Sequence, residues 1–352
     1  MYTSPHLLRY NERVRIADRE SSDLALCDAF AAVEAARGEI SLSYFEFGTL
    51  AAMWLFLRQQ VDVAIFEVGL GGRLDAVNVF DPDCAIVTSV DLDHMDYLGD
   101  DRETIGWEKA GIFRADKPAV CADANPPHRL LEHAEQIHAD LKLIGRDFYA
   151  QPETSQWRFV SRGGWNFSLP FPALRGAYQL CNAGACLAAL ETLRERLPVT
   201  PDNIRRGLLE ASVAGRFQVL PGRPVVILDV AHNPHAARAL AANLRQMEKS
   251  GRTIAVFAML ADKDVGGVVA AMKDVVDVWL VCGIDHERGM GAVALATHVA
   301  DAVHEVFPDI GAAYLHACQI AGEDDRIVAF GSFHTVAEIM RQRMFNYSFA
   351  SP

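Results

Sequence analysis

Side chains able to bind a divalent cation follow two apolar, β-branched segments of the chain. Glu67 ends the first of these segments, and Asp91, Asp93 and His94 follow the second. The carboxyl ends of parallel strands meet at one edge of an open α/β sheet, where such sheets bind ligands. Mg²⁺ takes few protein oxygens and keeps waters and phosphates as its other ligands. The pattern therefore favours a metal site over a purely structural hydrogen bond from His94.

A glycine-rich turn follows Glu67, since residues 69–73 read GLGGR. Such a turn can bring backbone N–H groups to an anion, as in dinucleotide-binding sites. The match to that fingerprint is poor because Leu74 stands where the third glycine belongs. A glycine turn beside a solvated glutamate is the structural alternative.

Lys109 lies between Glu108 and the turn residue Gly111. A lysine in the last turn of a helix often does no more than face solvent near the helix dipole. The functional alternative is a lysine that points at a phosphate or a metal ion.

In the second half of the chain, polar residues again follow an apolar segment that is expected to form a strand. Asn233 and Pro234 fit the cap and first position of a helix. Capping does not account for Asp229 and His232, which lie at a strand end beside a helix N-terminus, a place that favours anions.

Ser332 and His334 follow the last predicted strand. Thr335 and Glu338 have the spacing of a capping box, which leaves Ser332 and His334 to face a ligand. Arg216 either reaches a phosphate or forms a salt bridge between domains.

Apolar, β-branched segments alternate with longer segments of helical periodicity, which predicts an α/β fold with parallel sheets. Strands are expected at Asp62–Val68, Cys84–Val90, Val225–Val230, Thr253–Met259, Val276–Val281 and Arg326–Phe330. Helices are expected at Ala183–Leu197, Thr200–Ala214, His235–Glu248, Ala292–Val306 and Thr335–Met344. An antiparallel hairpin is expected at 157–169, around Gly163-Gly164. The glycines and prolines of 215–224 predict a linker between domains 1–214 and 225–352.

The charge balance excludes broad classes of partner. The chain has 33 basic and 46 acidic side chains and a net charge of −13, which argues against general binding of nucleic acids or membrane surfaces. The longest uncharged apolar run, Phe47–Leu57, is far shorter than the roughly 20 residues that span a bilayer. The N-terminus shows no signal-peptide pattern, and the seven cysteines form no C-x-x-C pair. We expect a cytoplasmic protein with reduced thiols.

In their order along the chain, these motifs resemble the folylpolyglutamate synthase/dihydrofolate synthase family of Mur-ligase-like, ATP-dependent amide ligases. The motifs are Ser4–Leu7, Tyr44–Thr49, Glu67–Arg73 with Asp75 and Asn78, Thr88–Gly99, Glu108–Phe113, Asn182, Gly215–Phe217, Asp229–His235, Met259–Asp264 and Gly331–Val336. They span nearly the whole chain and are closest to the bifunctional bacterial enzymes. The resemblance implies a P-loop-type parallel-sheet domain followed by a smaller, Rossmann-like α/β domain of the Mur ligase C-terminal type.

The resemblance also implies roles for individual residues. It implies Mg²⁺ ligation by Ser4, Glu67 and His94, with Lys109 carbamylated to act as a further, bridging ligand. It implies ATP contacts from Asn182, Arg216 and Asp229. It places the incoming glutamate near His232, Ser332 and His334, and makes Lys109 and His232 the catalytic residues. It places the pterin-bearing substrate near Phe45, Gly72, Arg73, Asp75 and Asn78.

The implied reaction joins L-glutamate to dihydropteroate or to a reduced folate through an acyl phosphate made from ATP. Dihydropteroate as acceptor gives dihydrofolate, and a reduced folate gives a polyglutamate. The partners are small molecules only, and the resemblance implies a monomer. Two alternatives are a catalytically inactive module that binds folate or a partner, and another Mur-type ligase that extends a peptidoglycan precursor.

The sequence departs from the family pattern in one respect. Family members carry a phosphate loop, G-T-N-G-K-G-[ST], about two strands before the motif that matches Ser4-Pro5-His6, and no G-x-x-x-x-G-K-[ST] occurs in these 352 residues. Such a loop supplies N–H donors and a lysine to the triphosphate. We expect a shortened P-loop-type domain that binds ATP weakly and has little or no activity.

Overall fold

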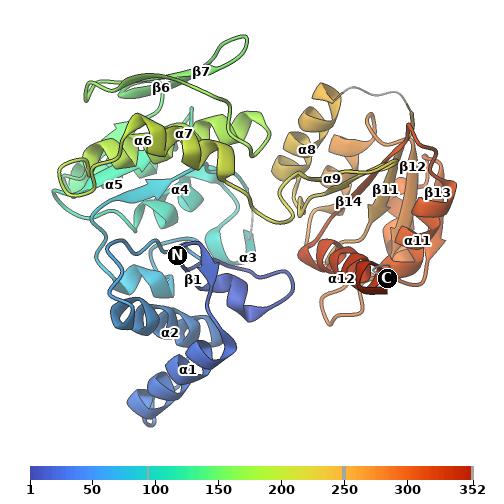
Figure 1. Ribbon diagram of the computed structural model, residues 1–352, viewed down its shortest axis with the longest axis horizontal. Coiled ribbons are helices and arrows are strands. Elements are labelled where there is room, and N and C mark those ends of the chain that lie inside the picture. Colours follow the sequence, from blue (N-terminus) through green and yellow to red (C-terminus); the bar gives the residue numbers. More distant parts are fainter. Residues whose placement is uncertain (93–94, 248–250, 350–352) are drawn as a thin grey trace. The chain divides into compact units, whose positions relative to one another are not determined.

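The chain folds into two compact units in the computed structural model, which describes residues 1–92, 95–247 and 251–349 (Figure 1). The first unit comprises Met1–Leu169 and Cys181–Pro201, and the second comprises Pro170–Leu180 and Asp202–Pro352. These bounds differ from the predicted division at residues 214–225. Residues 170–180 group with the second unit, where the N–H of Ala173 donates a 2.8 Å hydrogen bond to the carbonyl of Leu208.

A parallel sheet forms the centre of the first unit. Its strands are β3 (Ala85–Val87), β4 (Pro118–Cys121) and β5 (Asp140–Leu143), paired in that order. Helices α4 (Arg102–Ala110) and α5 (His128–Gln136) pack on it, because Ile105 and Leu130 lie in one apolar cluster with Val87 and Ala119. Strand β3 confirms the prediction at 84–90 in part.

A second apolar cluster holds the N-terminal part of the first unit. Helices α1 (Asp23–Arg37) and α2 (Tyr44–Arg58) pack against each other around Tyr2 and Phe56 (Figure 1). Ser43 and Glu46 start α2 with a capping box, in which each side chain bonds to the other residue's backbone. The short elements of this region are η1 (Tyr10–Arg13), β1 (Arg15–Ile16), β2 (Arg19–Glu20), η2 (Ala76–Val79) and α3 (Met95–Leu98).

The segment 62–68 is not a sheet strand, so this prediction is wrong. It pairs only at Phe66, through one bridge to Tyr2. Val63 and Ile65 are 44% and 58% exposed. A strand is stabilised by cross-strand neighbours, and β-branched composition alone does not supply them.

The predicted hairpin is confirmed and carries a third strand. Strands β7 (Trp157–Ser161) and β8 (Asn166–Leu169) are antiparallel, with Phe159 opposite Phe167. Strand β6 (Phe148–Pro152) adds to the other side of β7. The sequence analysis missed β6 because its residues Ala150-Gln151-Pro152 lack the alternation of a half-buried strand. Helices α6 (Ala177–Thr192) and α7 (Pro201–Glu210) follow.

A six-stranded sheet forms the second unit, in the order β13-β12-β11-β14-β10-β9. The strands are β9 (Gln218–Leu220), β10 (Val225–Leu228), β11 (Thr253–Phe257), β12 (Val278–Cys282), β13 (His304–Phe307) and β14 (Arg326–Phe330). All pairs are parallel except β9 with β10. Strand β9 lies inside the predicted linker 215–224, so this segment is part of the sheet. Its glycines and prolines flank the strand instead of replacing it.

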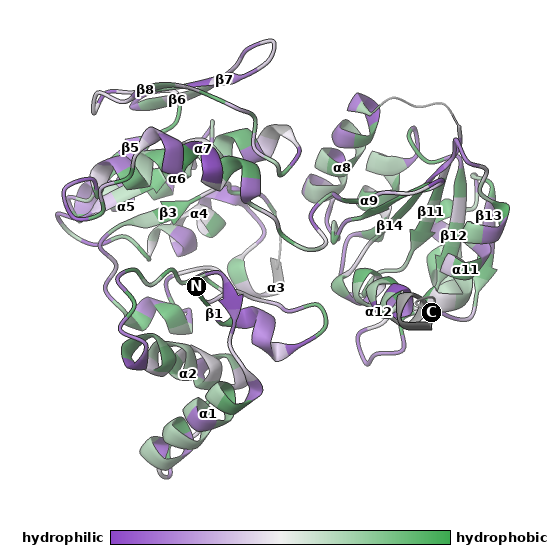
Figure 2. Ribbon diagram, viewed as in Figure 1, coloured by the Kyte–Doolittle hydropathy of each residue, from purple (hydrophilic) through white to green (hydrophobic). Residues whose placement is uncertain are grey.

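Helices cover both faces of this sheet. Helices α8 (Pro234–Gln246), α9 (Val265–Met272) and α10 (Ala292–Ala296) pack on one face with Phe257 and Trp279. Helices α11 (Ile310–Ile320) and α12 (Phe333–Phe349) pack on the other face, and the strands between are largely hydrophobic (Figure 2). The helix predicted over 292–306 ends early, since η3 (Thr297–Val299) and then β13 follow α10.

The two units confirm the predicted α/β class: a parallel-sheet first unit and a second unit of the Rossmann-like type. Within the part of the chain that the structure describes, no helix combines the length and apolar character that crossing a bilayer requires.

The aromatic centre of the second unit should dominate its stability. Phe330 is fully buried, with its ring 4.9 Å from that of Phe257. We expect Phe330→Ala to lower the free energy of unfolding by about 3–5 kcal/mol. Hydrogen exchange of the β11 and β14 peptides in urea measures this loss within the second unit. Val306→Ala, on a residue that is 47% exposed, is the control and should cost less than about 1 kcal/mol. Equal losses in both variants would contradict the proposed core.

Candidate active site

Glu67 lies beside the N-terminal residues of the chain. The hydroxyl of Thr3 and the N–H of Ser4, the latter at 3.2 Å, both donate to its carboxylate oxygen Oε2. The N–H of Glu67 in turn bonds to the carbonyl of Tyr2 at 2.9 Å. The structure therefore brings together Ser4 and Glu67, two of the four residues predicted to bind Mg²⁺. His94 and Asp93 lie outside the described residues.

Asp75 holds the glycine-rich turn. Its Oδ2 accepts the N–H groups of Gly69 and Leu70 at 3.1 and 2.9 Å, and its Oδ1 accepts that of Val77 at 3.0 Å. Burial raises the pKa of Asp75 against these hydrogen bonds, which favour the ionised form. Phe45 of α2 lies against Gly69. The carboxylate of Asp75, predicted to contact substrate, is thus engaged by backbone.

The turn packs on the end of α4. A Cβ on Gly72 would lie 2.8 Å from the carbonyl oxygen of Glu108, so only glycine fits without a shift. Arg73 forms a 2.9 Å ion pair with Glu108, and its guanidinium lies 4.6 Å from the ring centre of Trp107. The end of α4, which carries Lys109, is fixed against the turn by these contacts.

The side chain of Asn78 also forms hydrogen bonds with the backbone. Its amide nitrogen donates to the carbonyls of Arg73 and Gly111 at 2.9 and 3.0 Å. Asn78 thereby ties the turn to the end of α4, and any role toward substrate is one of positioning. Asn182, predicted to contact ATP, lies in α6 and is half-buried.

A small cavity of about 140 Å³ lies where the turn meets α4. Gly69, Gly71, Asp91 and Lys109 are among the residues that line it. Two predicted strand ends therefore do converge, and Lys109 joins them. Over residues 1–92, 95–247 and 251–349, no cluster of three or more His, Cys, Asp or Glu side chains has metal-binding geometry.

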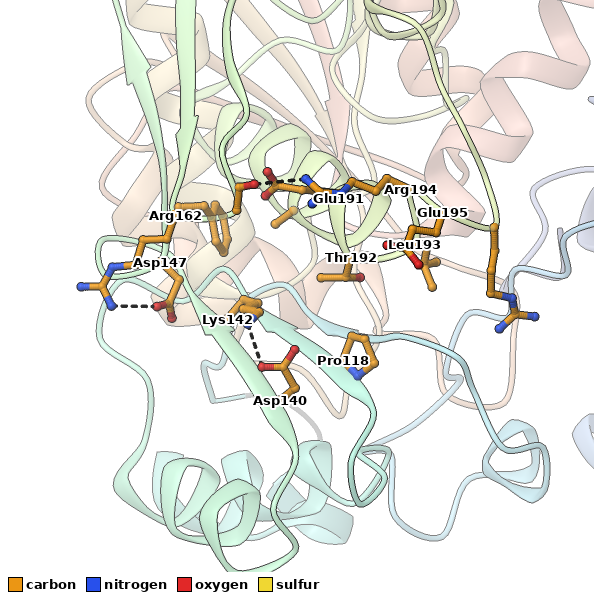
Figure 3. Close-up of a pocket in the computed structure, with 14 residues that line it drawn as sticks. Pro118, Asp140, Lys142, Asp147, Arg162, Glu191, Thr192, Leu193, Arg194 and Glu195 are labelled. Atoms are coloured by element: carbon orange, nitrogen blue, oxygen red, sulfur yellow. Dashed lines mark hydrogen bonds and ion pairs between the residues drawn. The ribbon is translucent and has the colours of Figure 1, made fainter.

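A larger cavity of about 580 Å³ lies elsewhere in the first unit, between β4, β5, the β6–β7 hairpin and the end of α6 (Figure 3). Four of its charged side chains form two pairs, Lys142 with Asp140 at 2.7 Å and Arg162 with Asp147 at 3.3 Å (Figure 3). None of the predicted site residues lines it. We place the candidate site at the smaller cavity, because the groups able to do chemistry gather there.

The carboxylate of Asp229 holds the backbone around the candidate site in the second unit. Its two carboxylate oxygens accept the N–H groups of Phe217 and Ala231, each at 2.8 Å. Burial raises its pKa, opposed by these hydrogen bonds and by the positive charge of Arg216. The side chain of Arg216 lies over the ring of Phe333, 5.8 Å from its centre.

His232 is oriented by the backbone. Its Nδ1 lies 2.8 Å from the carbonyl oxygen of Val230, which can only accept, so Nδ1 carries a hydrogen. The predicted cap is confirmed, since Asn233 accepts the N–H of Ala236 at 2.9 Å and Pro234 opens α8. The basic nitrogen of neutral His232 is therefore Nε2.

Ser332 is buried, so the prediction that its side chain faces a ligand is wrong for the described conformation. Its Oγ accepts the N–H of Thr335 at 3.0 Å and lies 2.7 Å from the Thr335 hydroxyl, which donates to the carbonyl of Ala258. Helix α12 begins at Phe333, one residue after Ser332. The prediction of a capping box between Thr335 and Glu338 is wrong. Ser332 caps the helix instead, and Glu338 forms an ion pair with Arg341.

His334 is exposed and belongs to a cluster that the sequence analysis did not single out. Its ring centre lies 4.9 Å from that of His286, in the loop after β12. Arg288 of the same loop pairs with Asp262. The signal available in the sequence was the pair His286 and Arg288 between Gly283 and Gly289, directly after a strand.

Two family profiles match the sequence. The Mur ligase middle domain matches residues 27–190, and the glutamate ligase domain of Mur ligases matches residues 215–333. The dihydrofolate synthase/folylpolyglutamate synthase of Escherichia coli K12 is 44% identical over 97% of this chain and 79% of its own length. The enzyme of the same name from Haemophilus influenzae is 38% identical, over 96% of this chain and 81% of its own.

Solved structures agree with this likeness. E. coli FolC in complex with DHPP and ADP has a TM-score of 0.94 at 43% identity, covering 98% of this chain and 82% of its own. A bifunctional folylpolyglutamate synthase/dihydrofolate synthase with Mn, AMPPNP and L-glutamate bound has a TM-score of 0.91 at 44% identity, covering 97% and 82%. The ligands named here are bound in the structures of those relatives.

The pKa of His334 should be low. Partial desolvation of the ring is the largest cause, and the neighbouring His286, Arg341 and Arg288 also lower the pKa from the ordinary value of 6.5. The unfolded chain then binds the proton first, so stability falls as the pH decreases from 6.5 through the folded pKa. A ¹H–¹³C NMR titration of the His334 Cε1–H should show the low pKa, and Arg288→Met should raise it. A pKa of 6.5 or above in the parent protein would contradict this description of the cluster.

Proposed function

Because this chain belongs to the dihydrofolate synthase/folylpolyglutamate synthase family of Mur ligases, we propose that it is an ATP-dependent ligase that adds L-glutamate to dihydropteroate and to reduced folates. The observation that carries the proposal is the 44% identity to the E. coli enzyme over 97% of the chain. The names of these relatives favour folate substrates over a peptidoglycan precursor. The partners are ATP, L-glutamate and the pterin-bearing acid, and the protein acts as a monomer.

The residues around Glu67 fit a magnesium ion. Mg²⁺ is usually bound through one or two carboxylates together with phosphate oxygens and waters. The Glu67 carboxylate and the Ser4 hydroxyl, on residues joined by a hydrogen bond, would supply hard oxygen ligands, and His94 would supply a third group. The ion would neutralise charge on the phosphates of ATP. Lys109, beside Asp91 at the small cavity, would be carbamylated and so present oxygens in place of an ammonium group.

The reaction follows from the chemistry of carboxylates. The acceptor's carboxylate attacks the γ-phosphate of ATP, so that ADP leaves and an acyl phosphate forms. The amine of L-glutamate then attacks the acyl carbon, an amide forms and phosphate leaves. Nε2 of His232 would take the proton from this amine, since Nδ1–H faces the carbonyl of Val230. Asn182, Arg216 and Asp229 would contact ATP.

The side chains around the turn would act on the pterin-bearing substrate in two ways. Phe45, Gly72 and Arg73 would contact it directly. Asp75 and Asn78 would position the turn, because their hydrogen bonds go to backbone groups of this segment. In the second unit, His232 and His334 would hold the glutamate, and Ser332 would act through the cap of α12.

Removal of the Glu67 carboxylate should impair turnover. We expect Glu67→Ala to lower kcat for glutamate-dependent phosphate release by about 10²-fold or more at saturating MgATP, since charge on the transferring phosphate loses a counter-ion site. Release of phosphate with dihydropteroate and L-glutamate is the measurement. Glu135→Ala, on an exposed residue of α5, is the control and should change kcat less than twofold. Equal rates for the parent and Glu67→Ala would contradict the assignment.

The expectation of weak nucleotide binding by these 352 residues stays a prediction. Lacking the N–H donors and lysine of a phosphate loop, they should bind MgADP at least tenfold more weakly than the E. coli relative. Isothermal titration of both proteins under one buffer condition measures the difference. Equal affinities would contradict this expectation and would favour Lys109, Arg216 and the groups around Glu67 as the phosphate contacts.

A further inference from the structure

The larger cavity of the first unit lies at the edge of the parallel sheet opposite the candidate active site. Pro118 and Asp140, the first residues of β4 and β5, line this cavity. Asp91, at the smaller cavity, instead follows the carboxyl end of β3. The volume of about 580 Å³ falls in the range of roughly 300–1,000 Å³ that is typical of small-molecule sites. The larger cavity is therefore separate from the site proposed for the ligase reaction.

One buried carboxylate in this cavity has no cationic partner. Glu191, in the last turn of α6, is 8% exposed and lies in the cavity wall (Figure 3). Its Oε1 accepts the hydroxyl of Ser161 at 2.7 Å and the N–H of Trp165 at 2.9 Å. Both donors are neutral, and no basic side chain among the described residues forms an ion pair with Glu191. Burial of a carboxylate without a counter-charge costs free energy, so this arrangement favours a cation in the cavity.

The turn between β7 and β8 fixes the position of this carboxylate. A Cβ on Gly163 would lie 2.5 Å from Cδ of Glu191, so a side chain at this position of the turn would displace the carboxylate. The donors Ser161 and Trp165 flank the same turn. Glu191 is therefore held in its place by the protein itself, before any ligand binds.

Negative charge is in excess at this end of α6. The two ion pairs described above neutralise four of the lining side chains, and Arg196 pairs with Asp83 at 2.6 Å. Glu195, four residues after Glu191, is exposed and has no ion-pair partner in the part of the chain that the structure describes. The last carbonyl groups of α6 add the partial negative charge of a helix C-terminus.

Arg194 carries the remaining positive charge among the described lining residues. It is exposed, and its Nη1 donates to the carbonyl of Gly163 at 3.1 Å and not to a carboxylate. The carboxylates of Glu191 and Glu195 thus lie at the cavity with this single guanidinium. Two negative charges against one positive charge favour a ligand with a single positive charge.

The donor set suits an organic cation and not a metal ion. No group of three or more His, Cys, Asp or Glu side chains within the described ranges could hold a metal ion, and the cavity is much larger than an ion. Phe148, Leu193 and Ala188 add apolar surface to the wall, which suits a hydrocarbon chain. A primary ammonium group has three N–H donors, enough to reach Oε2 of Glu191 and the carboxylate of Glu195 together.

We propose that this cavity binds a small aliphatic amine as its ammonium ion. The charged group lies at Glu191 and Glu195, and the hydrocarbon part lies against Phe148 and Leu193. Arg194 competes with the ligand for the negative charge. The proposal concerns binding alone and does not depend on the ligase function.

A ¹H–¹⁵N NMR titration of the whole chain with n-butylammonium chloride tests the proposal. The backbone N–H of Trp165 is the reporter because it donates to Glu191. At constant ionic strength, we expect a saturable shift of this signal with n-butylammonium and none with 1-butanol, a neutral molecule of similar size. The same shift with both probes, or no saturable shift in the parent protein, would overturn the proposal.

Two substitutions remove negative charge from the cavity. We expect Glu191→Gln to raise Kd for n-butylammonium by about tenfold or more, because a charge-assisted hydrogen bond is lost. The amide oxygen of glutamine can still accept from Ser161 and Trp165, so the turn is kept. Glu195→Gln, on an exposed residue, should raise Kd by about threefold. An unchanged Kd in both variants would contradict the assignment of the ammonium group.

Arg194→Met distinguishes a cation site from an anion site. Loss of the competing guanidinium should lower Kd for n-butylammonium by about twofold or more. A higher Kd in this variant would show that Arg194 helps to hold the ligand, and would overturn the proposal. Glu135→Gln, which removes an exposed carboxylate of α5 in the same unit, is the control and should change Kd less than about twofold.

Discussion

Parallel pairing of β10, β14, β11 and β12 is the constraint on which the second unit's chemistry depends. It makes the four strands end at one edge, so residues far apart in the chain lie along that edge: His232 after β10, His334 after β14 and Arg288 after β12. The aromatic core beneath, with Phe257 and Phe330 in contact, keeps these ends in register. In the first unit the corresponding constraint is local, because Asp75 holds a glycine turn against the end of α4.

The sequence predicted the segments whose own composition and residue spacing determine their structure. The buried strands β11 and β14, the hairpin at β7 and β8 and the cap of α8 by Asn233 were all predictable, since composition and spacing suffice. Segment 62–68 failed because a sheet strand depends on its neighbours. The helix prediction was wrong at residues 304–307, because the apolar spacing of a helix continues into this segment. In the structure the segment pairs with β12 and forms β13.

The positions of the candidate site residues could be predicted from the sequence, but the hydrogen-bond partners of their side chains could not. The motifs located Lys109, Asp229 and His232 at strand and helix ends, where the structure places them, whereas Glu67 lies in a segment that forms no strand. Which polar atoms are already engaged was not readable from spacing: Asp75 bonds to backbone N–H groups, and Ser332 is buried as a cap. Arg288 was missed because its neighbours come from other loops.

The net charge of the chain has a kinetic meaning for an anionic substrate. A chain with a net charge of −13 repels an anionic amino acid at long range. Dissolved salt screens the distant repulsion over about 10 Å at 0.1 M, but screens a contact at short range much less. Capture of the amino acid would then become faster, not slower, as ionic strength rises toward that of a cell.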